Sequence, residues 1–132
     1  MTAVVIIADS GTEMARLTTS VGALRNTEIV RHASGRTSVA ALIAVHEPTL
    51  VVISEMTPRR LTLERLVEVR AVAPQAAVVV VTADACSRWL AEALRAGATA
   101  VVPGELDPRA LGSVLREVLA TDSTAGELAI AA

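Results

Sequence analysis

Five short apolar runs, made mostly of valine, isoleucine and alanine, recur along the chain. The apolar positions are continuous within each run rather than alternating, which is typical of parallel strands buried on both faces. Longer amphipathic segments separate the runs. The pattern therefore predicts a βα unit repeated five times and wound into a parallel sheet with helices on both faces. The predicted strands are Ala3–Ala8, Glu28–His32, Leu50–Ile53, Ala77–Val81 and Thr99–Val102.

Polar residues and prolines mark the ends of the predicted helices. Ser10 and Glu13 have the spacing of a capping box. A proline follows an N-cap residue at Thr57-Pro58 and again at Asp107-Pro108, which indicates two further helix starts. The predicted helices, with the residues expected to face inward, are one after Ser10 (Met14, Leu17, Val21, Leu24), Thr37–Val45 (Val39, Leu42, Ile43), one from Pro58 that stops before Pro74 (Leu63, Leu66, Val67), Asp84–Ala96 with a C-cap at Gly97 (Leu90, Ala93, Leu94), and one from Pro108 (Leu111, Val114, Leu115, Val118, Leu119).

Composition and charge narrow the classes of function. The chain has 132 residues, 52% hydrophobic and 20% charged, which is typical of one globular domain with its own core. The net charge is −2 and Trp89 is the single aromatic residue, which argues against nucleic-acid binding by charge or by base stacking. No apolar run is long enough to span a bilayer, so we expect a cytoplasmic protein without membrane contact. Residues 1–120 are expected to form the domain, and residues 121–132 a linker or disordered tail.

Candidate chemistry is sparse. The one cysteine, Cys86, has no zinc-ligand spacing with His32 or His46. The sequence carries no phosphate-binding loop or nucleophile elbow, so it predicts no enzyme, catalytic residue, metal or cofactor. In open parallel sheets the functional crevice lies at the carboxyl ends of the strands. The polar or small residues at these ends are Asp9, Ser10, Ser34, Ser54, Thr82 and Gly104. Only one of them is a carboxylate, and all twelve basic residues of the chain are arginine.

Four stretches in order carry a resemblance to a known family. They are Val4–Ser10, Pro48–Pro58, Val78–Ala83, and Ala93–Val102 followed by Leu106–Pro108. Together they resemble response-regulator receiver domains (CheY-like), most like those of NarL/LuxR-type regulators, over about residues 3–120. The resemblance implies a flavodoxin-like fold with strand order 2-1-3-4-5. It also implies a magnesium-dependent phospho-aspartate and an output domain further along the chain.

The departures from the family pattern lead to the functional prediction. The phospho-acceptor position falls on Ser54, which is a poor nucleophile without a neighbouring base. The second acidic position falls on Ser10, which leaves Asp9 as at most a residual metal ligand, so no Mg²⁺ is expected. The family's lysine falls on Gly104. The chain therefore resembles a pseudo-receiver.

The resemblance also places the switch residues. They fall on Thr82 and Val101, and only the Thr82 hydroxyl is kept. The degenerate phosphorylation pocket implied by the resemblance consists of Asp9, Ser10, Ser54, Thr82 and Gly104. Glu55 lies one residue past the acceptor position, so its side chain is expected to face the other side of the sheet unless the strand end bulges.

Three functional hypotheses follow. The first is an atypical, phosphorylation-independent receiver domain of a LuxR-type transcription regulator, which forms a homodimer and reaches DNA only through an output domain not present in this chain. The alternative is a stand-alone pseudo-receiver that senses a small-molecule effector in the degenerate pocket. The third is a working phosphotransfer receiver that uses Asp9 or Glu55.

Two surface questions stay open at this point. The candidate dimer face consists of Trp89, Leu111, Leu115 and Val118, although Trp89 fits the margin of the core equally well. Arg59 and Arg60 either bridge the mouth of the crevice to Glu105 or are solvated at a helix start.

Overall fold

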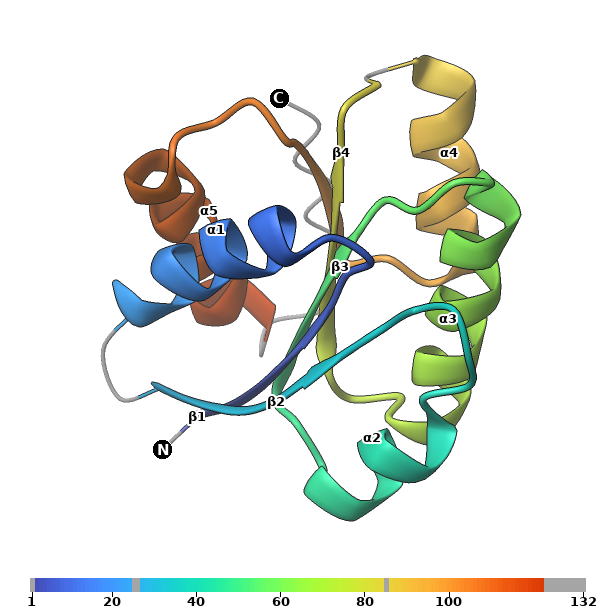
Figure 1. Cartoon of the computed structure of the whole chain (residues 1–132), viewed down its shortest axis with the longest axis horizontal. Helices are drawn as coiled ribbons and strands as arrows, with labels where there is room; N and C mark the ends of the chain where they lie inside the picture. The colour runs from blue at the N-terminus through green and yellow to red at the C-terminus, as the bar shows by residue number, and fades with distance from the viewer. Residues whose placement is uncertain (1, 25–26, 85, 123–132) are drawn as a thin grey trace.

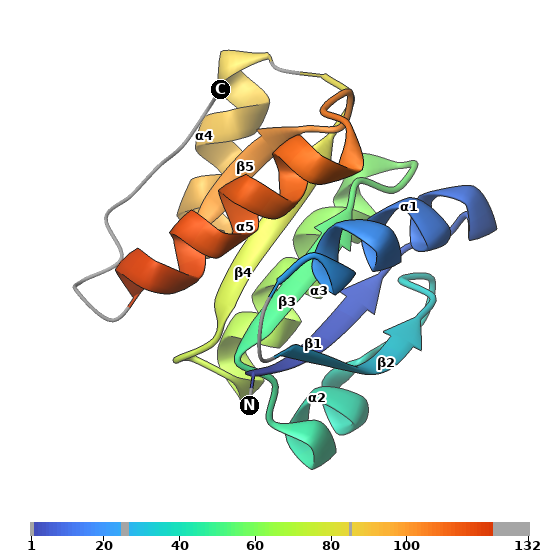
Figure 2. The ribbon, with the colours of Figure 1, turned by 90° about the vertical axis from the view of Figure 1, so that its left-hand side faces the viewer.

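A five-stranded parallel sheet forms the centre of the protein, with strand order β2-β1-β3-β4-β5 (Figures 1 and 2). The computed structural model describes residues 2–24, 27–84 and 86–122. The strands are β1 (Thr2–Ile7), β2 (Thr27–Ala33), β3 (Leu50–Ser54), β4 (Ala77–Thr82) and β5 (Ala100–Pro103). The predicted α/β class and strand order are confirmed, and each predicted strand lies within two residues of its observed ends.

Five helices cover the sheet in two layers, as Figure 1 shows. The helices are α1 (Gly11–Gly22), α2 (Ala40–His46), α3 (Arg59–Val72), α4 (Ser87–Ala96) and α5 (Pro108–Asp122). The α1 and α5 helices lie on one face, and α2, α3 and α4 lie on the other. None of the helices in the described ranges is long and apolar enough to cross a membrane.

Successive side chains of β1, β3, β4 and β5 enter opposite cores. In β1, Val4 and Ile6 pack under α1 and α5, whereas Val5 and Ile7 pack under α2, α3 and α4. Every residue of β3 is buried, as is every residue of β4. Burial on both faces explains why the strands read as continuous apolar runs.

Several helix ends follow the polar signals. The Ser10 hydroxyl accepts a hydrogen bond from the Glu13 N–H at 3.2 Å, as the capping box predicts. The α3 helix stops before Pro74, and Gly97 ends α4 with a φ of 122°, which favours glycine. Pro58 is the N-cap of α3 rather than its first helical residue, because its ψ of 158° is extended.

Two helices begin later than predicted, and in each case a side chain binds a backbone N–H just before the observed start. The α2 helix begins at Ala40 instead of Thr37, since the Glu68 carboxylate binds the Val39 N–H and holds that residue outside the helix. The α4 helix begins at Ser87 instead of Asp84. The Asp84 carboxylate accepts from the Cys86 N–H at 3.0 Å, which places the acid in the loop.

The buried face of α3 differs from the apolar stripe. Val67, predicted to face inward, is 55% exposed, and Leu63 is only half-buried. Polar side chains lie in the interior instead. The Thr62 hydroxyl accepts from the Met56 N–H at 2.8 Å, and Arg65 donates to the Gly35 carbonyl at 2.8 Å. These bonds offset the cost of burying polar groups.

The predicted dimer face is wrong, because its four residues are interior. Trp89 and Val118 are 1% exposed, and Leu111 and Leu115 are fully buried. The α5 stripe covers the sheet, so these side chains offer no surface to a second chain.

The α5 helix continues to Asp122, beyond the predicted boundary at residue 120. The rest of the predicted tail, residues 123–132, lies outside the described residues.

Candidate functional site

A cavity of about 420 Å³ opens at the carboxyl ends of β3 and β4, beside the first turn of α1. Its lining residues are Glu13, Arg16, Ser54, Glu55, Thr57, Val81, Thr82, Ala83, Asp84 and Gly104. The structure therefore brings together Ser54, Thr82 and Gly104 from the predicted pocket. These three residues come from different strand ends, which meet at the same edge of a parallel sheet.

Asp9 and Ser10, which were predicted to belong to this pocket, do not line the cavity, and neither does Val101, which was predicted only as a switch position. Asp9 forms an ion pair with Arg36, with 3.3 Å between Oδ2 and the guanidinium nitrogen. The Ser10 hydroxyl caps α1. Val101 is 2% exposed and belongs to the core beneath α3 and α4.

On the side of the cavity next to α1, a series of hydrogen bonds begins at Ser54. The Ser54 hydroxyl donates to Glu13 Oε2 at 3.2 Å, and Arg16 donates to the same carboxylate oxygen at 3.2 Å. Arg16 also donates to the Leu106 carbonyl at 2.9 Å. A Cβ atom placed on Gly104 would lie 3.5 Å from the Arg16 guanidinium. A cation from α1 therefore lies beside the position where the family pattern has its lysine.

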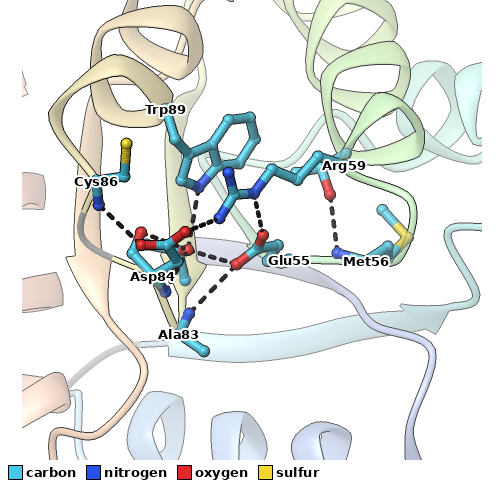
Figure 3. Close-up of polar contacts among 9 residues, drawn as sticks. Glu55, Met56, Arg59, Ala83, Asp84, Cys86 and Trp89 are labelled. Atoms are coloured by element: carbon cyan, nitrogen blue, oxygen red, sulfur yellow. Dashed lines mark hydrogen bonds and ion pairs between the residues drawn. The ribbon is translucent and has the colours of Figure 1, made fainter.

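The Glu55 carboxylate holds the other side. It follows the last residue of β3, and its Oε1 accepts hydrogen bonds from the Thr82 hydroxyl and, at 3.3 Å, from the Ala83 N–H (Figure 3). Its Oε2 accepts from Arg59 Nε at 2.6 Å. The side chain was expected to face away from the crevice. It reaches Thr82 because β3 has ended at Ser54, so strand alternation no longer fixes its direction.

Thr82 links this carboxylate to α4. The Thr82 hydroxyl accepts from the indole N–H of Trp89 at 3.0 Å. The guanidinium carbon of Arg59 lies 4.9 Å from the centroid of the same ring, which is within cation–π range. Arg59 also pairs with the Asp84 carboxylate, whereas Arg60 pairs with Glu64 at 3.5 Å. The sequence left open whether these arginines bridge to Glu105. In the structure Arg59 pairs with Glu55 and Asp84 instead.

The charges on this side stabilise one another. Hydrogen bonds from Arg59 and, to a smaller extent, from the Cys86 N–H lower the pKa of the Asp84 carboxyl. The hydrogen bonds to Glu55 and Asp84 raise the pKa of Arg59. Both shifts favour the charged forms at neutral pH.

The donor set does not fit the Mg²⁺ that receiver domains use. Mg²⁺ prefers near-octahedral oxygen coordination with one or two carboxylates. Asp9 is paired with Arg36, and Glu13 and Glu55 are each paired with an arginine. Within the described ranges, no three His, Cys, Asp or Glu side chains are grouped so that they could hold a metal ion.

Sequence reasoning missed Glu13, Arg16 and Asp84 as lining residues. In the sequence Glu13 shows only the spacing of a capping box, and Arg16 lies one turn further along α1. The spacing of three residues between Glu13 and Arg16 indicates that they share one face of the helix. Only the placement of α1 over the sheet shows that this face borders the crevice.

The fold is shared with solved receiver domains, although no protein-family model and no curated protein matches the sequence. A CheY-like receiver domain from Methanospirillum hungatei aligns with a TM-score of 0.79 and 20% identity, covering 93% of this chain and 97% of the other. A LuxR-family response regulator from Aurantimonas sp. has a TM-score of 0.78 and 20% identity, covering 99% and 90%. A protein named for pilus assembly, from Burkholderia thailandensis, has a TM-score of 0.70 and 24% identity, covering 91% and 99%. At these identities the likeness shows the receiver-domain fold.

Proposed function

We propose that this chain is a receiver-type regulatory module that works without phosphorylation. The observation that carries the proposal is the Glu55 carboxylate, which binds the Thr82 hydroxyl and the Ala83 N–H at the mouth of the crevice. A phosphoryl group bound here would need the same donors, because its oxygens are also hydrogen-bond acceptors. The internal carboxylate therefore competes with any phosphoryl group for this end of β4.

The surroundings of Ser54 support the same proposal. The residue is 6% exposed, and its hydroxyl already donates to Glu13. The same Glu13 oxygen also accepts from Arg16 at 3.2 Å, so the carboxylate oxygen beside the hydroxyl is already shared with a cation. A serine hydroxyl without an effective base is a poor nucleophile. Phosphotransfer to this position is therefore disfavoured by both access and chemistry.

The output of the module is the second part of the proposal. Regulation of transcription is favoured by the LuxR-family neighbour. The proposal further includes a separate output domain that binds DNA, and a homodimer in the cytoplasm. The neighbour named for pilus assembly marks another output that the same fold can serve. The reading frame beyond Ala132 discriminates between them: a helix-turn-helix there supports transcription, and a different downstream domain contradicts it. Light scattering at micromolar concentration tests the dimer, and a monomer throughout refutes it.

A second candidate function is the sensing of a small ligand in the cavity. Its volume of about 420 Å³ is in the range of small-molecule sites. Hydroxyls of Ser54, Thr57 and Thr82 could orient a ligand there. A thermal-shift screen tests this, since a ligand at about 100 times its Kd stabilises a protein by about 2.7 kcal/mol. A hit whose effect survives Ser54→Leu, which fills the cavity, does not bind there.

The test of the main proposal is labelling by a phosphodonor. The protein is incubated with acetyl phosphate and Mg²⁺, beside an active receiver domain as positive control, and its intact mass is measured. We expect no stoichiometric adduct on this chain. A magnesium-dependent adduct on Asp9, Ser54 or Glu55 refutes the proposal.

A further inference from the structure

The only aromatic ring of the chain is attached to the crevice by a relay of two hydrogen bonds. Trp89 lies on α4 with 1% exposure, and its indole N–H can only donate. Thr82 accepts this bond, and its single hydroxyl proton is free to be donated onward to Glu55. The direction of the relay is therefore fixed from α4 through β4 to the residue after β3.

Arg59 closes the relay from the side of α3. Its guanidinium lies over the Trp89 ring and also binds the Glu55 and Asp84 carboxylates (Figure 3). One side chain from the first turn of α3 thus contacts the crevice, the β4–α4 loop and α4. Loss of either carboxylate leaves Arg59 with one partner in place of two.

We propose that Glu55, Arg59, Thr82, Asp84 and Trp89 form a latch that couples the state of the crevice to the first turn of α4. The latch deepens the proposed function, on which it rests, by naming how that site is regulated. In the closed state, the Glu55 carboxylate accepts a hydrogen bond from the Thr82 hydroxyl. When the Glu55 carboxylate is withdrawn, the Thr82 hydroxyl turns to its other acceptor, the Asp84 carbonyl at 3.2 Å. Thr82 Oγ still accepts from the indole, but this bond is no longer strengthened by a charged acceptor beyond it, so the amino end of α4 is held less firmly.

Because Trp89 is the sole aromatic residue, its signals report on the latch without interference. The experiment measures hydrogen exchange of the indole N–H by NMR, together with acrylamide quenching of the fluorescence. Glu55→Ala and Thr82→Val are each expected to speed indole exchange by about tenfold or more, because opening no longer breaks a hydrogen bond supported by a charge. Glu55→Gln keeps the shape of the side chain and removes its charge, and it should also speed exchange of the indole N–H.

Matched variants separate a latch from general loosening. Thr82→Ser keeps the hydroxyl and should keep the wild-type exchange rate. Glu92→Gln neutralises an exposed acid on α4 itself and should change nothing. Adding Glu55→Ala to Thr82→Val should give no further increase, because both act through one relay.

Two results would overturn the latch. One is a folded Glu55→Ala protein, judged by circular dichroism and cooperative unfolding, whose indole exchanges and is quenched as in the wild type. The other is a double variant whose effects multiply as independent changes. These measurements use no phosphodonor, so their failure is distinguishable from that of the proposed function. A labelled protein with a responsive indole refutes only the proposed function, and an unlabelled protein with an unresponsive indole refutes only the latch.

Discussion

Replacing Thr82 by valine removes one hydroxyl from a strand that otherwise contains only valine and alanine. Judged from the sequence, the change should be neutral or favourable, since valine suits a buried strand. The structure predicts the opposite. The hydroxyl of Thr82 accepts from Trp89 and donates to Glu55, and the residue is 2% exposed. The Trp89 indole, which is 1% exposed, would be left in the interior without its acceptor.

The magnitude follows from the groups left behind. A buried indole N–H without an acceptor costs about 1–3 kcal/mol, and the lost hydrogen bond to the Glu55 carboxylate costs about 1.5–3 kcal/mol. Burial of the added methyl group returns about 0.8 kcal/mol. The expected net loss of unfolding free energy is about 3 kcal/mol. For a domain of this size that lowers Tm by roughly 12 °C.

The assay is urea unfolding followed by circular dichroism for the wild type, Thr82→Val and Thr82→Val in a Trp89→Phe background. Phenylalanine has no N–H, so valine should cost at least about 1 kcal/mol less in that background, which measures the coupling. A Thr82→Val protein as stable as the wild type would refute the claim that the Thr82 hydroxyl joins Trp89 and Glu55 by hydrogen bonds. Equal costs of valine in both backgrounds would show that the indole does not depend on the hydroxyl.

Two further predictions concern packing and charge. Gly112→Ala should lower the free energy of unfolding by about 1 kcal/mol in a urea titration, because a Cβ would lie 3.0 Å from the Ser20 carbonyl oxygen and overpacking outweighs the helix propensity gained. Gly22→Ala, where a Cβ meets nothing within 4 Å, is the control and should raise it by about 0.5–1 kcal/mol. Asp84→Asn should lower Tm at pH 7. Arg59 lowers the pKa of Asp84 in the folded state, so the contribution of the pair is present above the unfolded pKa and is lost as pH falls through the folded one. The Tm difference should therefore begin to shrink as pH falls below about 4, the ordinary pKa of an aspartate, and a constant difference down to pH 2 would contradict this.

The fold could be predicted because its determinants are local. Continuous apolar runs identify strands buried on both faces, and the caps at Ser10 and Gly97 act within a few residues. The rotation of α3 could not be predicted in this way. Val67 belongs to the apolar stripe, yet Thr62 and Arg65 are buried instead, because they bind backbone groups of Met56 and Gly35, which lie outside the helix.

The candidate site likewise combines residues that the sequence predicts with residues that only helix packing brings there. Ser54, Thr82 and Gly104 lie at strand ends, which the topology of a parallel sheet brings to one edge. Glu13 and Arg16 join them only because α1 lies over that edge, and the packing angle of a helix is not encoded in its periodicity. Thr82 and Trp89 are seven residues apart, so their contact depends on how α4 leaves the β4–α4 loop.

The central claim is that Glu55 already holds the donors that a phosphoryl group would need. The most direct test is an NMR titration of the protein with beryllofluoride and Mg²⁺, observed at the indole N–H of Trp89. We predict that this resonance stays in place up to saturating concentrations for an active receiver domain. A saturable, magnesium-dependent shift of the indole signal would contradict the claim.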